Sequence, residues 1–251
     1  MAFFDAEKSK LYIAQFDLSS VCVDMGVQSQ EGLYDVTTFG DGGRKWFRGL
    51  ADDKLTVETI YTDASGGSDD VLNAILRART KSTGPDVITA LPGGDLISAQ
   101  GYSTNHGWIK NPVINSRVGN RVDLSAGELE MSEMDALKSL KARHTSNITA
   151  DENGTAIDDG ASTSAGGVFV VHAFVLTASG GNTQWVMRLQ MDTTGGFSSP
   201  TDAATLTFTN ATGPQALRAA FTGTFERHVR IQFDLDATSG TLQAWAGYER
   251  L

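Results

Sequence analysis

The sequence predicts a mainly β protein with two β-rich parts and one packed α-helix. Glycine is frequent and proline is rare, at 27 and 5 of 251 residues, a balance typical of many turns between strands. Short β-branched or aromatic runs end at Gly, Asp or Asn along the whole chain. With 40% hydrophobic residues the chain can form real cores. We expect an N-terminal β-barrel or sandwich that carries the helix, and a C-terminal β-sandwich of jelly-roll or immunoglobulin-like type.

The N-terminal part contains five predicted strands, at residues 11–16, 55–61, 86–91, 108–118 and 121–131. The last strand shifts register after Gly127, which indicates a β-bulge. An amphipathic helix is predicted over residues 68–79, with Ser68 as its N-cap and an apolar stripe that includes Val71 and Leu72. Residues 132–143 also show helical spacing and form a second helical candidate.

A polar run of Thr, Ser, Asn, Asp and Gly at residues 145–167 marks the clearest boundary. Such a segment buries too little surface to offset its ordering entropy, so it reads as a linker or an exposed loop. We therefore predict a domain at 1–145, a linker at 146–166 and a second domain at 167–251.

The C-terminal part contains six predicted strands at short, regular spacing, at residues 168–177, 184–191, 204–210, 216–223, 227–235 and 241–249. In the fifth of these, Val229, Ile231 and Phe233 alternate with polar residues. This alternation is typical of a sheet with one buried and one wet face.

Charge and cysteine content exclude several classes of protein. The net charge of −10 argues against tight binding of a polyphosphate, although it is compatible with nucleic acid passing without adhering. The single cysteine, Cys22, excludes an internal disulfide and a multi-thiolate zinc site. Neither a signal peptide nor a membrane-spanning apolar run is visible, so we expect synthesis in a cytoplasm and no membrane span.

The stretch DVTTFGDGGRKWFRGL, residues 35–50, combines glycines, aromatics and cations. It lacks the Ser or Thr of a Walker A loop and the helix of a dinucleotide fingerprint. Interleaved basic and aromatic residues would suit a nucleic-acid groove, but acidic residues flank them. A third interpretation, which we favour, is an exposed hairpin arm that docks on an acidic neighbour. The predicted contact residues are Phe39, Asp41, Arg44, Lys45, Trp46, Phe47 and Arg48.

No pattern indicates catalysis, and we expect a protein that is not an enzyme and needs no cofactor or metal. The four histidines are scattered and have no ligand spacing. Acidic groups such as Asp158–Asp159 and Asp234/Asp236 could bind calcium, but none has EF-hand spacing. Trp185, Trp245 and Tyr248 are candidate platforms for a glycan, with core packing as the alternative.

The first 145 residues resemble the tail tube (major tail) proteins of long, non-contractile-tailed bacteriophages. The resemblance is carried by D-V-T-T-F-G-D at 35–41, G-L-x-D at 49–52, the helical segment GGSDDVLNAIL and the late strand NRVDLSAGELEM. It implies a subunit of hexameric rings that stack into a hollow tube through which DNA passes. It also implies that residues 35–50 reach the adjacent ring, and that partners include other tail proteins such as the tape measure and the terminator. The implied location is the virion tail.

The C-terminal part departs from a minimal tube subunit and is similar to sandwich domains appended to virion proteins. A carbohydrate-binding or adhesion protein and a head-decoration protein therefore remain alternatives.

Overall fold

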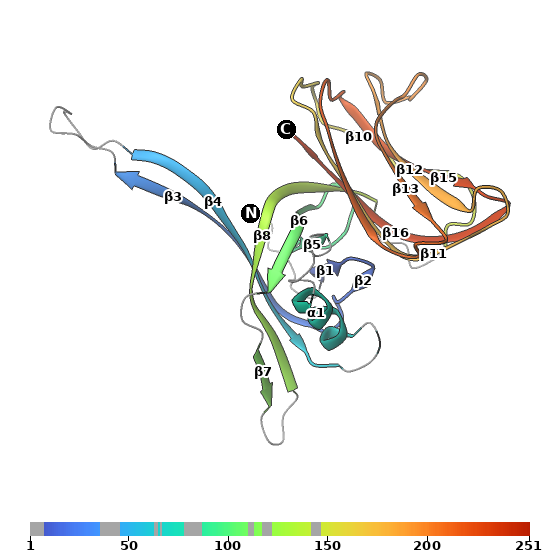
Figure 1. Ribbon diagram of the computed structural model, residues 1–251. Helices are drawn as coiled ribbons and strands as arrows, with labels where there is room; N and C mark the ends of the chain where they lie inside the picture. Colours follow the sequence, from blue (N-terminus) through green and yellow to red (C-terminus); the bar gives the residue numbers. More distant parts are fainter. Residues whose placement is uncertain are drawn as a thin grey trace, which may run out of the picture. The chain divides into compact units, whose positions relative to one another are not determined.

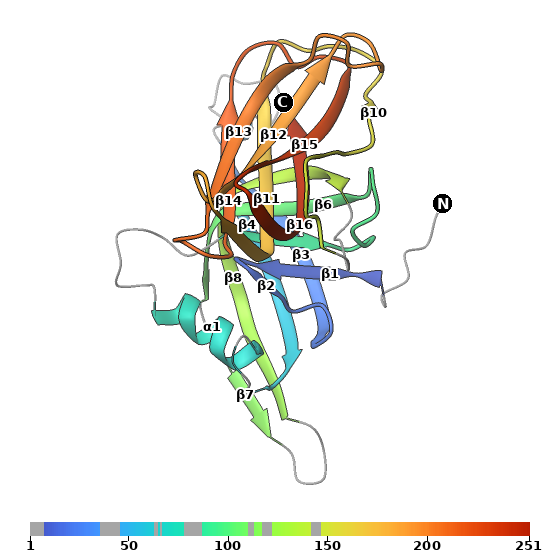
Figure 2. The ribbon, with the colours of Figure 1, turned by 90° about the vertical axis from the view of Figure 1, so that its right-hand side faces the viewer.

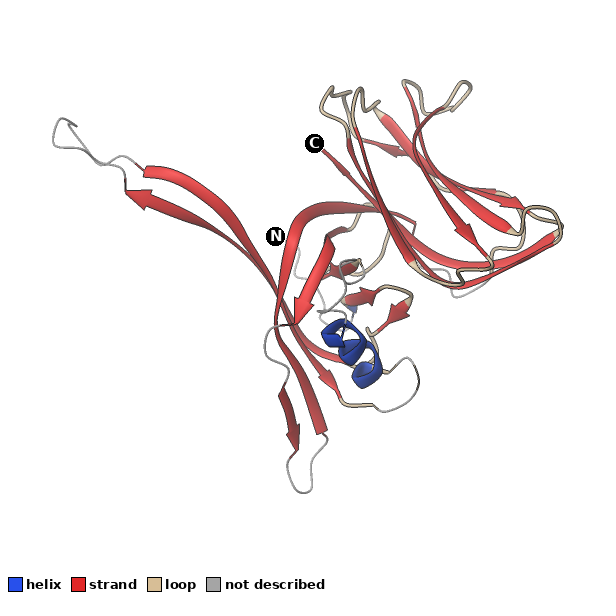
Figure 3. Cartoon of the chain, viewed as in Figure 1, coloured by secondary structure: helices blue, strands red, loops and turns tan. Residues whose placement is uncertain are grey.

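The computed structural model describes residues 8–35, 46–62, 65, 67–77, 87–109, 113–116, 122–141 and 147–251. It confirms the predicted mainly β class, with antiparallel sheets and, in the described part, one short helix (Figure 3). That helix is α1 (Ser68–Arg77). The strands are β1 (Lys10–Ile13), β2 (Phe16–Asp17), β3 (Cys22–Asp35), β4 (Trp46–Ile60), β5 (Ile88–Leu91), β6 (Gln100–Ile109), β7 (Val113–Ser116), β8 (Val122–Lys141), β9 (Glu152–Asn153), β10 (Ile157–Asp158), β11 (Gly167–Ser179), β12 (Gln184–Asp192), β13 (Thr201–Thr209), β14 (Ala216–Phe221), β15 (His228–Asp236) and β16 (Ser239–Arg250).

The chain forms two compact units whose boundaries differ from the predicted ones. Unit 1 comprises Met1–Ser20, Asp86–Asn105 and Asp135–Leu251, and unit 2 comprises Val21–Pro85 and His106–Met134. The predicted division of the chain into domains at 1–145 and 167–251 therefore does not match these units. Early strands belong to the same unit as the C-terminal sandwich.

The sandwich of unit 1 confirms all six predicted C-terminal strands. One sheet contains β14, β11 and β16, and the other has the order β10-β15-β12-β13 (Figure 1). Alternate residues of both sheets point into a shared core, as the alternation of β15 predicted. The largest fully buried side chains of this core are Phe169, Trp185, Phe208, Phe225, Phe233 and Tyr248.

Strand β11 is buried on both faces, which explains the corrected boundary. Phe169 and Val171 belong to the sandwich core, whereas Val168 and Val170 belong to a second cluster. That second cluster also contains Tyr12, Val87, Leu91, Leu137 and Trp245. Because β11 needs apolar cover on both sides, residues from β1, β5 and β8 complete unit 1.

The polar run at 146–166 is part of the sandwich, so its prediction as a linker is also wrong. Strands β9 and β10 each pair with β15. Ile148 and Thr163 form backbone bridges to Leu242 and Phe225. Backbone groups of this segment thus form hydrogen bonds with the sheet edges, and side-chain composition does not predict such pairing.

Unit 2 contains α1 and a sheet in which β4 pairs with β3 and β8, while β7 pairs with the first part of β8 (Figure 2). The predicted bulge is confirmed. Val57 pairs with Gly127 and Glu58 with Ser125, which leaves Ala126 without an opposite residue. The second helical candidate, 132–143, is wrong, because residues up to Lys141 continue β8.

Helix α1 begins close to its predicted position. The carbonyl of Gly67 accepts the first helical bond, from the amide of Val71, so Gly67 is the N-cap and Ser68 the first helical residue. The hydroxyl of Ser68 instead donates to the carbonyl of Ile60 at 2.7 Å and accepts from the amide of Thr62 at 3.0 Å. Ser68 thereby joins the helix start to the end of β4. No helix in the described ranges is long and apolar enough to cross a membrane.

Candidate assembly interface

The hairpin of β3 and β4 is the longest two-stranded element of unit 2. Its strands have 14 and 15 residues and pair from Cys22–Thr59 to Asp35–Trp46. At the usual rise per residue such a ribbon is about 45 Å long. Register shifts occur at both of its ends, between Cys22 and Asp24 and between Glu31 and Leu33. Bulges of this kind increase the local twist of a ribbon.

Only the base of this hairpin rests on another strand. Strand β8 pairs with Asp53–Ile60 of β4, where Leu55 and Val57 are buried. Residues 46–52 of β4, on the loop side of Asp53, pair with β3 alone among the described residues. Asp53 lies at this transition, and its buried Oδ1 atom has no hydrogen-bond partner in the described part of the chain.

Three of the predicted contact residues lie in the described part of the hairpin, at the start of β4. Phe39, Asp41, Arg44 and Lys45 fall outside the described residues. The backbones of Trp46, Phe47 and Arg48 begin β4 and pair with Asp35, Tyr34 and Leu33 respectively. Their contact with a neighbouring ring stays a prediction.

Cys22 lies at the base of the hairpin and is partly buried. Burial, followed by the charge of Asp24, raises the pKa of its thiol to about 11. The thiol is therefore protonated near neutral pH, and a low-pKa nucleophile is not expected at this position.

The three aromatic residues predicted as glycan platforms are buried, which corrects that interpretation. Trp185, Trp245 and Tyr248 are each 0% exposed. The indole N–H of Trp185 donates to the Thr177 carbonyl at 3.1 Å, and that of Trp245 to the Ser139 hydroxyl at 3.2 Å. No ring face is available for a sugar to stack on, so core packing is the correct interpretation.

Tyr248 is anchored in the same way. Its hydroxyl donates to Asp159 Oδ2 at 2.7 Å, and the ammonium group of Lys138 lies 2.6 Å from the other carboxylate oxygen. Burial, followed by the hydrogen bond to Asp159, raises the pKa of Tyr248 well above its ordinary value. Sequence alternation placed this ring in a strand but did not predict its polar anchor.

The acidic groups considered as calcium ligands have protein partners. Asp158 accepts two hydrogen bonds from Arg227, which hold its pKa well below the ordinary value. Asp234 pairs with Arg188. Within the described ranges, no three His, Cys, Asp or Glu side chains are grouped so that they could hold a metal ion.

A buried ion pair that the sequence did not predict joins β14 to β8. Arg218 donates to both carboxylate oxygens of Asp135, at 2.7 and 2.9 Å. The two side chains are only 12% and 7% exposed. Glu249 lies beside them, and burial raises its pKa. In the sequence, Asp135 alternates with Leu137 and Ser139 at the spacing of one face of a strand. The prediction of a helix at 132–143 hid this pattern.

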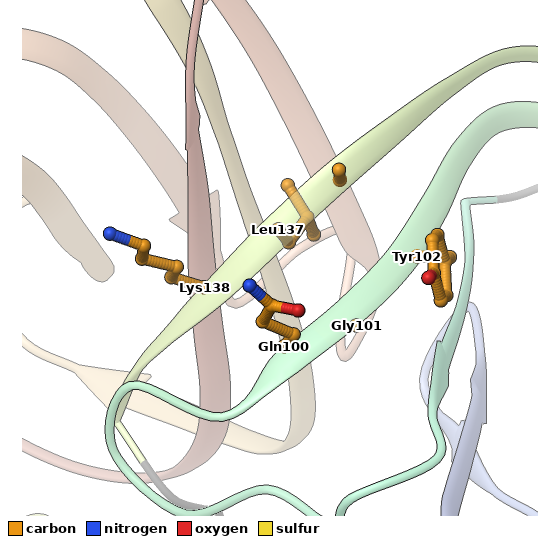
Figure 4. A pocket seen from close by; sticks show the side chains of 6 residues that line it. Gln100, Gly101, Tyr102, Leu137 and Lys138 are labelled. Atoms are coloured by element: carbon orange, nitrogen blue, oxygen red, sulfur yellow. The ribbon is translucent and has the colours of Figure 1, made fainter. Parts of the chain in front are cut away.

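One depression of unit 1 lies between β6 and β8. It has a volume of about 110 Å³, and Figure 4 shows the side chains along the two strands. The lining residues are Gln100, Gly101, Tyr102, Ala136, Leu137 and Lys138.

Comparison with known proteins identifies no family. No protein-family model and no curated protein matches the chain. Among solved structures, the chain is similar to the Dit protein (gp 19.1) of phage SPP1, described as a paradigm of the hub adsorption apparatus in phages that infect Gram-positive bacteria. The identity is 12% and the TM-score 0.33, over 96% of this chain and 98% of that one. A score this low does not establish a common fold.

Proposed function

We propose that this chain is a structural protein of a phage tail, a tube subunit that assembles into stacked rings, and that it is not an enzyme. The β3–β4 hairpin supplies the contact between successive rings. The observation that carries this proposal is the outer half of the hairpin, which pairs only with itself in the described part of the chain.

A two-stranded ribbon without further support is marginally stable in water. A hairpin that extends beyond its supporting strand is therefore expected to gain stability from a neighbour.

The sequence resemblance supports the same role. The hairpin strands enclose the D-V-T-T-F-G-D segment at 35–41, and β4 contains the G-L-x-D segment at 49–52. In the tail tube proteins that the chain resembles, this loop reaches the adjacent ring. The net charge of −10 is compatible with a lumen that lets DNA pass without binding it.

Electron microscopy of the purified full chain at rising concentration, beside its mass in solution, tests the proposal. We expect rings or hollow tubes from the unaltered chain. Deletion of residues 40–48 should prevent stacking, and a Gly/Ser replacement of equal length should do the same, because it keeps the connection but removes the aromatic and charged contacts. Tubes of normal length from both variants would show that the hairpin makes no ring-to-ring contact.

A further inference from the structure

One face of strand β11 carries a cation and an acid on its two neighbouring strands. Val170 of β11 pairs with Arg218 of β14, and Val168 pairs with Glu249 of β16. Residues that lie directly opposite each other in an antiparallel pair share one face of the sheet. Arg218 and Glu249 therefore lie on the face of β11 that the second apolar cluster of unit 1 covers.

Strand β8 brings a second acid to the same face. Asp135 lies two residues before Leu137, a member of that second cluster, so the two side chains point to the same side of β8. Both carboxylate oxygens of Asp135 accept hydrogen bonds from Arg218. Asp135 is also the first residue of β8 that belongs to unit 1. Its contacts therefore fix the point at which β8 enters this unit.

The two acidic side chains are joined by a hydrogen bond. Glu249 bonds to Asp135 and accepts a further bond from the amide of Ala136. Ionised carboxylates have no proton to donate, so a bond between two carboxyl groups requires that one of them be protonated. Since Asp135 faces the guanidinium of Arg218, Glu249 is the group that carries this proton.

The charges of the cluster lead to the same assignment. Two ionised acids beside one arginine would leave a net negative charge where Arg218 and Asp135 are only 12% and 7% exposed. A single shared proton makes the cluster neutral and removes the repulsion between the acids. The neighbouring cations Lys138 and Arg250 bind around Asp159 instead.

We propose that Asp135, Glu249 and Arg218 form a proton-dependent clamp. One proton shared by the two carboxyl groups ties the start of the unit 1 part of β8 to β14 and β16. When Glu249 loses this proton, repulsion from Asp135 replaces the hydrogen bond and the attachment weakens. The clamp acts within a single chain, so its test is independent of the proposed assembly into a tube.

The clamp should stabilise unit 1 most at acidic pH. Burial raises the pKa of Glu249 above its ordinary 4.5, and the charge of Asp135 acts in the same direction. The folded chain therefore binds this proton more strongly than the unfolded chain. The contribution of the clamp is complete below about pH 4.5 and is lost as the pH rises through the raised pKa.

Urea unfolding of the full chain and of Glu249→Gln, at a series of pH values above and below 4.5, tests the clamp. A glutamine reproduces the protonated acid, because its amide can donate to Asp135 and accept from Ala136 without titrating. The midpoint of the unaltered chain should fall relative to that of Glu249→Gln as the pH rises, since all other titrating groups are the same in both chains. A difference that does not change with pH overturns the proposal.

The variant Asp135→Asn is the matched control, because it removes the acid with which the proton is shared. In that background Glu249→Gln should change the pH dependence less than it does in the unaltered chain. An effect of equal size would show that burial alone retains the proton, and would overturn the clamp.

Carbon-13 NMR of the side-chain carboxyl groups tests the same point without relying on the folding of Asp135→Asn. In the folded, unaltered chain the signals of Asp135 and Glu249 should move together in one step as the pH is raised. An Asp135 signal that stays constant while Glu249 titrates would also overturn the clamp.

Discussion

The Nδ1 atom of His172 lies 2.7 Å from the carbonyl oxygen of Ala14, a residue 158 positions away in the sequence. Because a carbonyl can only accept, Nδ1 carries a proton and donates it. The Nε2 atom lies 2.8 Å from the Thr89 hydroxyl, and the ring of Tyr12 packs against the imidazole. Ala14 has a φ of 52°, and its amide donates to the Val87 carbonyl at 3.0 Å. His172 and Val87 together hold this strained turn in place.

This histidine should make unit 1 sensitive to acid. Burial lowers the pKa of His172 from its ordinary 6.5 to about 4, and the hydrogen bond to Ala14 offsets part of that effect. The unfolded chain therefore binds the proton more readily than the folded one. Its contribution to stability is complete above about pH 6.5 and is lost as the pH falls from 6.5 toward 4, by roughly 3 kcal/mol in total.

Urea unfolding at several pH values checks this prediction. His172→Gln should flatten the pH dependence between 6.5 and 4, because its side chain does not titrate. An unchanged slope in His172→Gln would contradict the assignment.

Arg218→Ala should strongly destabilise unit 1. The substitution leaves Asp135 buried beside Glu249 without its cationic partner. Breaking a buried pair in this way typically costs roughly 3–5 kcal/mol. Arg227→Ala is the matched control, because its pair with Asp158 is exposed and should contribute little. Equal denaturation midpoints for the two variants would contradict the prediction.

Gly166→Ala should reduce stability by about 2 kcal/mol or more. Gly166 has a φ of +82°, and an added Cβ atom would lie 2.2 Å from the Phe221 carbonyl oxygen. Both the backbone conformation and the contact with a neighbouring strand forbid a side chain. Gly196→Ala should be nearly neutral, because nothing lies within 4 Å of the added atom. Thermal unfolding of the two variants makes the comparison, and similar melting temperatures would contradict it.

Trp185→Ala should act on stability and leave sugar binding unaffected. The side chain is fully buried in the sandwich core, so its removal should cost roughly 3–5 kcal/mol. Calorimetric unfolding measures that loss. The unaltered chain and the conservative Trp185→Phe variant should give the same result on a glycan array. A signal that is present for the unaltered chain and lost in the variant would restore the platform interpretation.

Local pattern in the sequence determined most of the strands. The alternation of Val229, Ile231 and Phe233 predicted β15 and its buried face, and the register change at Gly127 predicted the bulge of β8. These features depend on side-chain period and on turn residues, which each segment carries by itself. The segment at 132–143 was ambiguous for the same reason, since apolar residues in a short run can fit either period.

Only the tertiary structure decided what packs against each face. The run Val168–Val171 is apolar at every position, which indicates that both sides of the strand are buried. The pattern does not indicate which residues cover each side. Strands β1, β5 and β8 cover one of those sides, which moved the boundary between the units. The bond from His172 to Ala14 and the pair of Arg218 with Asp135 also join distant segments. Long-range partners depend on how strands pair in space, and local periodicity does not encode that choice.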